Sequence, residues 1–321
     1  MSFKTKVKAA SPDFLVHGYR DVSSSLTLLT SRNKRFLRFA PPGHFYSPIP
    51  DIDDINSPAI RANGRVESIP GVRLNERGQL DRAEEFAKNY PDMPFPEQAA
   101  PGLRYHLDNQ WFSYGDGVVL YSMMRDLKPR RIIEVGSGFS SAAMLDVNDR
   151  FFDGKIELTF IEPYPKRLRG VLGGADTAHY TILEAPVQDA PMECFGKLEA
   201  NDILFIDSSH VGKVGSDVLH LLFNVLPTLA PGVVVHFHDI PWPFEYPHTW
   251  LEQGRAWNEA YFLRSFLQYN TSFEIAYFNS FLATNHATAI SGLMPLAMRR
   301  PSAELTEGNS SIWIVKQAQA G

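Results

Sequence analysis

Short apolar runs alternate with helical patterns along the chain from about residue 112 onward. Runs that are apolar throughout and separated by helices are typical of parallel strands buried on both faces of a sheet. Right-handed crossovers between such strands give a doubly wound, Rossmann-like α/β fold. Five strands are predicted in this way, at residues 131–135, 156–161, 180–183, 202–206 and 233–238.

Helical periodicity fills the intervals between these runs. A longer helix is predicted near residues 254–269, and two closing strands at 273–281 and 310–315. About thirty residues separate the closing strands, and we expect them to form a functional loop. The earlier helices are predicted at residues 114–127, 140–149, 165–172, 192–197 and 213–229.

The first part of the chain has a different character. Residues 1–111 show little periodicity and several proline-rich turns, with one helical pattern at about 78–89. We interpret this region as an irregular N-terminal cap that covers the substrate, followed by the main domain at 112–321. A second covering segment is expected after the fifth strand, where the proline- and aromatic-rich residues 241–250 predict a lid.

Composition narrows the classes of partner. Of the 321 residues, 44% are hydrophobic, and the net charge of -5 favours neither nucleic acid nor an anionic membrane. No apolar stretch is long enough to span a membrane, so we expect a cytoplasmic protein. The single cysteine, Cys194, excludes an internal disulfide framework and a thiolate metal cluster. Self-association into a homo-oligomer is left open.

The first predicted strand ends in a glycine loop, Glu134-Val135-Gly136-Ser137-Gly138. Ligands of doubly wound sheets bind beyond the carboxyl ends of the strands, where such a loop lets backbone approach them closely. A nicotinamide fingerprint requires Gly or Ala where Ser141 stands. The carboxylate of Glu134 suits the cation S-adenosylmethionine and would repel a pyrophosphate. A plain strand-to-helix turn is the alternative reading of this loop.

Residues after the second and third strands complete a nucleoside site. Glu162 ends the second strand, where a carboxylate accepts hydrogen bonds from both ribose hydroxyls. Val187 and Gln188 follow the third strand and are expected to contact adenine. Tyr114 and Asp116 begin the helix that leads into the core, and are expected to line the pocket or the cofactor mouth. Tyr114 is placed to contact the carboxylate of S-adenosylmethionine.

Titratable residues follow the fourth and fifth strands. Asp207 and His210 lie at the first of these ends, and His238 and Asp239 lie at the second. In one reading Asp207, His238 and Asp239 hold a divalent cation that lowers the pKa of a substrate hydroxyl, and His210 is the general base. In the other, no metal binds and a histidine paired with a carboxylate deprotonates the acceptor. Buried structural histidines are the third possibility.

Taken together, these motifs resemble the class I S-adenosylmethionine-dependent methyltransferases over roughly residues 112–317. The branch that includes the macrocin-type sugar O-methyltransferases is most similar, and catechol O-methyltransferase is more distant. The resemblance implies seven strands with the last antiparallel. It also implies that Glu134, Gly136, Ser137 and Gly138 hold the methionine part of the cofactor, with Glu162 on the ribose.

The same resemblance implies catalytic roles for the ends of the fourth and fifth strands. Asp207, His238 and Asp239 correspond to the Mg²⁺ ligands of metal-dependent members, and His210 to the base of some sugar methyltransferases. His238 departs from the usual acid or amide. Neutral imidazole suits Zn²⁺, Fe²⁺ or Mn²⁺ better than Mg²⁺, so the metal is either lost or changed.

The expected activity is methyl transfer from S-adenosylmethionine to oxygen of a small organic molecule, with metal assistance left open. The alternative is a metal-dependent enzyme of another class, such as an oxygenase, or a binding protein on the same fold. The histidines at the two strand ends raise this alternative.

Overall fold

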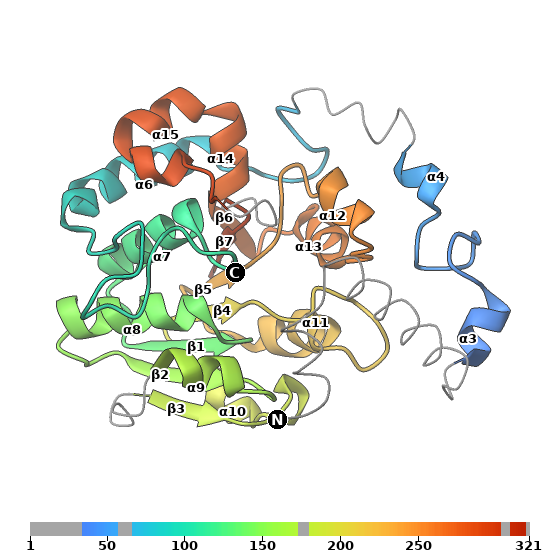
Figure 1. Ribbon diagram of the computed structural model, residues 1–321, viewed down its shortest axis with the longest axis horizontal. Helices are drawn as coiled ribbons and strands as arrows, with labels where there is room; N and C mark the ends of the chain where they lie inside the picture. Colours follow the sequence, from blue (N-terminus) through green and yellow to red (C-terminus); the bar gives the residue numbers. More distant parts are fainter. Residues whose placement is uncertain (1–33, 57–65, 173–179, 303–308, 319–321) are drawn as a thin grey trace, which may run out of the picture. The chain divides into compact units, whose positions relative to one another are not determined.

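The computed structural model describes residues 34–56, 66–172, 180–302 and 309–318 (Figure 1). The chain divides into two compact units, Met1–Ala62 and Asn63–Gly321. In the smaller unit, α3 spans Lys34–Phe39 and α4 spans Ile52–Ile55. The basic N-terminal residues and the rest of the cap before residue 34 lie outside the described residues.

The larger unit is built on one seven-stranded sheet with the strand order β3-β2-β1-β4-β5-β7-β6. The strands β1 to β5 pair in parallel, whereas β7 is antiparallel to both β5 and β6. This topology confirms the predicted doubly wound fold with an antiparallel last strand. The strands are β1 Arg131–Val135, β2 Glu157–Ile161, β3 Tyr180–Leu183, β4 Ile203–Ile206, β5 Val234–Phe237, β6 Phe273–Phe278 and β7 Ile312–Lys316.

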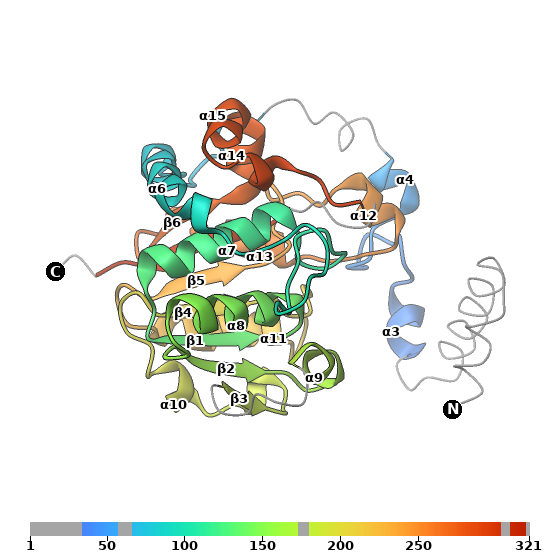
Figure 2. The same cartoon turned by 60° about the vertical axis from the view of Figure 1, so that its left-hand side comes forward.

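Helices cover the sheet, and those nearest the site precede or follow β1. The helix α7, Tyr114–Leu127, is buried over most of its length and packs on α8, Phe139–Phe151 (Figure 2). The helix α6, Glu76–Asn89, packs on α7 and β6, so residues after 66 belong to the larger unit. The predicted division of the chain into 1–111 and 112–321 stays a prediction.

The helices predicted after β2 are shorter in the structure than their sequence patterns indicate. The predicted helix at 213–229 is a succession of α11 (Asp217–His220), a π-helical turn (Leu221–Val225) and a 3₁₀ turn (Leu226–Thr228). The helix predicted at 254–269 is α13, Glu259–Leu267. The others are α9 Lys166–Leu172, α10 Met192–Phe195, α12 His248–Glu252, and the 3₁₀ turns Tyr90–Asp92 and Val187–Asp189.

The prediction of a long loop between the last two strands was wrong. This interval contains α14 (Asn279–Asn285), α15 (Ala287–Leu293) and a 3₁₀ turn (Pro295–Met298). Each helix is only two turns long and is bounded by His286 or by Met294-Pro295, so neither produces a periodic pattern of useful length. Phe281, Leu282 and Ile290 anchor these helices in the core.

Among the described residues, none of the helices has both the length and the apolar character that a membrane crossing requires.

Candidate active site

Backbone hydrogen bonds join the carboxyl ends of neighbouring parallel strands. Gly136 N–H donates to the carbonyl of Ile161 at 3.0 Å, and Asp207 N–H donates to that of Val135 at 2.9 Å. His238 N–H donates to the carbonyl of Ile206 at 2.9 Å. The residues that directly follow four neighbouring strands are therefore brought to one edge of the sheet, as the sequence predicts.

A cavity of about 510 Å³ opens at this edge. Its walls combine the loop after β1, the acid after β2, and the polar ends of β4 and β5. Trp250 and Trp257, which follow β5 in the sequence, also line it, so part of the predicted lid lies at the cavity. The predicted site residues that line it are Gly136, Ser137, Gly138, Glu162, Asp207, His210, His238 and Asp239.

A second cavity of about 390 Å³ adjoins the first. It shares Gly136, Glu162 and Asp207 with the larger cavity, and it adds Val187 and Gln188. The two cavities therefore meet where the glycine loop faces Glu162. This arrangement fits a ligand with an elongated shape whose middle part lies beside that acid.

Glu162 is held by the loop that it faces. Its Oε2 accepts a hydrogen bond from Ser137 N–H at 3.1 Å, and its Oε1 accepts one from Tyr164 N–H at 2.7 Å. These two donors fix the carboxylate at the junction of the cavities. The remaining lone pairs of both oxygens can accept hydrogen bonds from a vicinal diol.

Two residues predicted to contact the cofactor lie behind the cavity walls. Glu134 is fully buried and accepts hydrogen bonds from the hydroxyls of Ser140 and Ser141, at the start of α8. Burial raises the pKa of Glu134 to about 8, although the two serines oppose this shift. The hydroxyl of Tyr114 donates to Glu97 at 2.8 Å. Neither residue lines the larger cavity, and their contact with cofactor stays a prediction.

Three acidic side chains surround the imidazole ring of His210. Its Nδ1 donates to Oε2 of Glu259 at 2.9 Å. Its Nε2 lies 3.4 Å from Oδ1 of Asp207 and 3.7 Å from Oδ2 of Asp239. Burial alone would lower the pKa of His210, but the hydrogen bonds to Asp207 and Glu259 and the surrounding charges raise it well above the ordinary value. The imidazolium form is therefore favoured at neutral pH.

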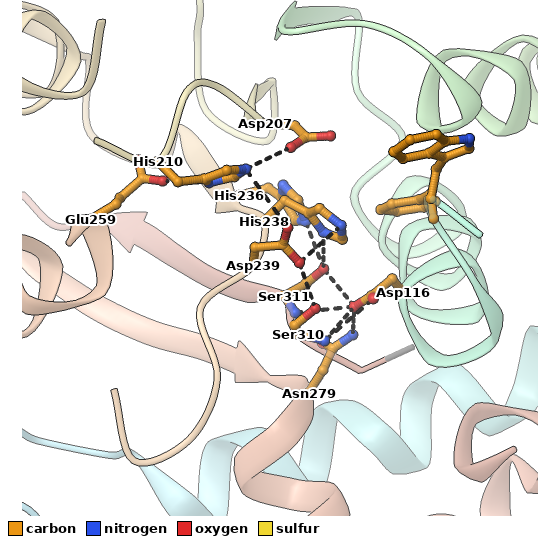
Figure 3. Close-up of polar contacts among 12 residues, drawn as sticks. Asp116, Asp207, His210, His236, His238, Asp239, Glu259, Asn279, Ser310 and Ser311 are labelled. Atoms are coloured by element: carbon orange, nitrogen blue, oxygen red, sulfur yellow. Dashed lines mark hydrogen bonds and ion pairs between the residues drawn. The ribbon is translucent and has the colours of Figure 1, made fainter. Parts of the chain in front are cut away.

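His236 in β5 and His238, which lies directly after the end of that strand, point to the same side, as the alternation predicts (Figure 3). His236 Nε2 lies 2.9 Å from the hydroxyl oxygen of Ser311, and His238 Nδ1 lies 3.4 Å from the same atom. Burial holds the pKa of His236 well below its ordinary value, and the charge of His238 adds to this. His236 is stacked on Phe205, with ring centroids 3.7 Å apart, and does not line the cavity.

His238 and Asp239 form the acidic end of the cavity. Nε2 of His238 lies 3.6 Å from Oδ1 of Asp239. Burial would lower the pKa of His238, but the charges of Asp239, Asp207 and Asp116 outweigh it and raise that pKa. Asp239 has a φ of +54°, so the strand ends before it and turns its carboxylate toward His210.

The three predicted metal ligands, Asp207, His238 and Asp239, are not arranged to coordinate one metal ion. No group of three or more His, Cys, Asp or Glu side chains among the described residues is placed to hold a metal ion. Nε2 of His210 lies within 4 Å of both Asp207 and Asp239, and it provides the positive charge that the two carboxylates face. The present geometry therefore does not fit a cation held by Asp207, His238 and Asp239.

Two acids have roles that the sequence did not assign. Glu259 is the partner of His210, and Asp116 accepts hydrogen bonds from the residues just before β7 instead of lining the pocket. Glu259 is the first residue of α13, where an acid ordinarily serves the helix dipole, so its sequence context gives no sign of a histidine partner. Asp116 is likewise in the first turn of α7.

Comparison with known proteins identifies related sequences. The Methyltransf_24 family, described as a methyltransferase domain, matches residues 133–240. An uncharacterized protein of Archaeoglobus fulgidus is 35% identical over 172 residues, which cover 51% of this chain and 75% of that protein. The family match runs from β1 to the residues just after β5 and so contains the glycine loop and both histidine-bearing strand ends.

Similar solved structures include two methyltransferases. One is PaMTH1 of Podospora anserina bound to S-adenosylhomocysteine, with 16% identity, a TM-score of 0.39, and coverage of 85% of this chain and 99% of that one. The other is a putative O-methyltransferase of Klebsiella pneumoniae, with 15% identity, a TM-score of 0.40, and coverage of 78% and 92%.

Proposed function

Because this chain belongs to the class I S-adenosylmethionine-dependent methyltransferase family, we propose that it transfers the methyl group of S-adenosylmethionine to an oxygen atom of a small organic molecule. In this reaction the acceptor oxygen attacks the methyl carbon, and the carbon–sulfur bond breaks to leave S-adenosylhomocysteine. The proton of the acceptor hydroxyl passes to a base. Catalysis then depends mainly on alignment of the two substrates and on removal of that proton.

The observation that carries this proposal is the meeting of two cavities at Glu162. In the proposed complex, adenine lies in the smaller cavity beside Val187 and Gln188, and the ribose hydroxyls donate to Glu162. The methionine part follows the loop of Gly136, Ser137 and Gly138 into the larger cavity. The polar ends of β4 and β5, which line the same cavity, would then be available to the methyl acceptor.

His210 is the proposed general base. Glu259 engages its Nδ1, which leaves Nε2 directed at the cavity end formed by Asp207 and Asp239. Only the neutral imidazole can accept a proton, so the raised pKa makes His210 a stronger base that is available in a smaller fraction of molecules at neutral pH. Trp250 and Trp257 line the same cavity and are proposed to pack on the acceptor and exclude water.

Replacing Glu162 with alanine is expected to weaken S-adenosylmethionine binding about 10- to 100-fold, because two hydrogen bonds from a diol to a carboxylate are lost. Isothermal titration calorimetry measures this change. Glu193→Ala is the matched control, since Glu193 is an exposed acid on α10 outside both cavities. Equal affinities for the Glu162 variant and the control would remove Glu162 from the cofactor site.

Chelation is expected to leave methyl transfer within about twofold of its initial rate, because the described acids and histidines do not form a metal cage. The rate would be measured with radiolabelled S-adenosylmethionine and an acceptor found by screening small phenols and sugars. Elemental analysis of the same preparation accompanies it. A rate that falls on dialysis against EDTA and returns with Mg²⁺ or Mn²⁺ would restore the metal-assisted mechanism. Tightly held iron without methyl transfer would favour the oxygenase alternative.

A further inference from the structure

The buried carboxylate of Asp116, near the carboxyl edge of the sheet, receives hydrogen bonds from three residues in two segments of the chain. Oδ1 of Asp116 lies 3.0 Å from Asn279 Nδ2, 3.1 Å from Ser310 N and 3.0 Å from Ser311 N. The hydroxyl of Ser311 lies 2.6 Å from the same oxygen. Asp116 does not line the cavity, so this cluster plays no direct part in the proposed reaction.

The protons around Asp116 can be assigned from the chemistry of its partners. Two backbone N–H groups and one amide NH₂ face Oδ1, and each of these can only donate. Oδ1 is therefore an acceptor, whether or not Oδ2 carries a proton. The hydroxyl hydrogen of Ser311 must point at Oδ1, because that short contact needs one hydrogen and the acid oxygen has none to give.

This assignment fixes the histidines on the other side of Ser311. With its hydrogen committed to Asp116, the oxygen of Ser311 can only accept from the two ring nitrogens that face it. Nε2 of His236, at 2.9 Å, and Nδ1 of His238, at 3.4 Å, therefore both carry hydrogen. When His238 is neutral, its lone pair is on Nε2, the nitrogen that faces Asp239.

The preceding serine makes the second connection. Its hydroxyl donates to Oδ1 of Asp239 at 3.0 Å, and its backbone N–H donates to Asp116 (Figure 3). Two consecutive residues just before β7 thus link one buried acid to both cavity-lining residues that follow β5. The strands reinforce this link, because Phe237 and Ile312 are register partners.

We infer that Asp116 is a positioning residue, which acts through Ser311 to hold His238 with Nδ1–H turned inward and Nε2 turned toward the cavity, and through Ser310 to orient Asp239. The consequence for catalysis rests on the proposed function: whenever His238 is neutral, Nε2 is the ring nitrogen that can accept a hydrogen bond from the methyl acceptor. The tautomer itself is a property of the folded chain and does not depend on which reaction the enzyme performs.

Nuclear magnetic resonance of the full chain labelled with ¹⁵N-histidine tests the inference. The spectra are recorded at alkaline pH so that His238 is neutral, and a His238→Gln spectrum assigns its signals. We expect a protonated Nδ1 and an unprotonated Nε2 in the wild type. In Ser311→Ala the two tautomers should become mixed, and Ser311→Thr, which keeps the hydroxyl, should restore the single tautomer. A neutral wild-type His238 that is protonated at Nε2 instead of Nδ1 overturns the inference.

A control variant distinguishes the general effect of removing a buried hydroxyl from the specific effect of removing the hydrogen bond between Ser311 and Asp116. Ser122 is also buried, and its hydroxyl donates to the carbonyl of Val118 within α7. Ser122→Ala should leave the tautomer of His238 unchanged, and an equal effect of both alanine variants would contradict the positioning role. Asp116→Asn keeps an acceptor oxygen and should preserve the tautomer better than Asp116→Ala, so equal spectra for these two would also contradict it.

Binding of S-adenosylhomocysteine distinguishes failure of this inference from failure of the proposed function. Calorimetry on the wild type tests the cofactor site, and absence of binding would remove the proposed function while leaving the tautomer measurement valid. We expect Ser311→Ala to bind S-adenosylhomocysteine within about twofold of the wild type. The altered hydroxyl of Ser311 lines neither cavity and does not contact Glu162 or the glycine loop. A large loss of binding in Ser311→Ala would instead indicate a general disruption of the edge and overturn the specific role.

Discussion

Gly136→Ala is expected to reduce S-adenosylmethionine affinity more than 100-fold and to destabilise the fold by about 3 kcal/mol or more. Gly136 has a φ of +80°, a conformation that costs alanine about 1–2 kcal/mol. A Cβ atom at this position would lie 1.7 Å from the backbone carbonyl oxygen of Asp207. Because that oxygen belongs to the main chain at the end of β4, no rotamer change can relieve the overlap.

The structural effect of this substitution should be largest at the carboxyl edge of the sheet. Gly136 N–H donates to Ile161 O and Asp207 N–H donates to Val135 O, so movement of either residue disturbs the alignment of β1 with its neighbours. Chemical denaturation and calorimetry measure the two effects. Gly292→Ala is the control, because Gly292 lies in α15 with open space around its would-be Cβ and should tolerate alanine. Similar behaviour of the two variants would contradict the close-approach argument.

The second large effect concerns His210. Replacing it with asparagine is expected to slow methyl transfer about 10²- to 10⁴-fold, the usual contribution of a general base. In the wild type, the rate should rise with pH along a limb whose midpoint lies above 6.5, because the base works in its neutral form and its acid neighbours raise its pKa. Glu259→Gln removes one of those neighbouring charges and should move the midpoint to lower pH.

Titration of the His210 ring signal by nuclear magnetic resonance gives the same pKa without an acceptor. The sign of the linked stability effect follows from the shift. A histidine whose pKa is raised in the folded state contributes stability that is fully present below pH 6.5 and is lost as pH rises through the folded-state pKa. Glu259→Gln should weaken this dependence. A His210 that titrates below 6.5, or a rate unaffected by its replacement, would exclude it as the proposed base.

The parallel part of the fold was predictable because its signal is local. The strand Arg131–Val135 has the predicted bounds, since a buried apolar run ends directly in a glycine turn. The helix predicted at 254–269 begins later than predicted, because a tertiary contact holds its first residues. Asn258 N–H and Glu259 N–H both donate to the carbonyl of His210, so these residues are held by a distant loop and helix α13 begins only at Glu259.

The convergence of the site residues was predictable where they share a strand end, whereas contacts between residues distant in sequence were not, and the roles of these residues stay predictions. Asp207, His210, His238 and Asp239 converge because parallel strands bring their carboxyl ends to one edge. Glu259 is 49 residues from His210, and Ser311 is 195 from Asp116, so neither pairing has a signature in local spacing. Glu134 matched a cofactor pattern, yet its side chain turns to Ser140 and Ser141 behind the loop.

The antiparallel insertion of β7 between β5 and β6 has a consequence for the order in which the molecule matures. During synthesis, β5 emerges about 75 residues before its partner, and until then it presents an unpaired apolar edge. Such non-local pairing is slow to form, because a long loop must close first. We therefore expect the edge that carries the candidate site to be among the last parts to become ordered on the nascent chain, and shielding of β5 in that interval should reduce aggregation.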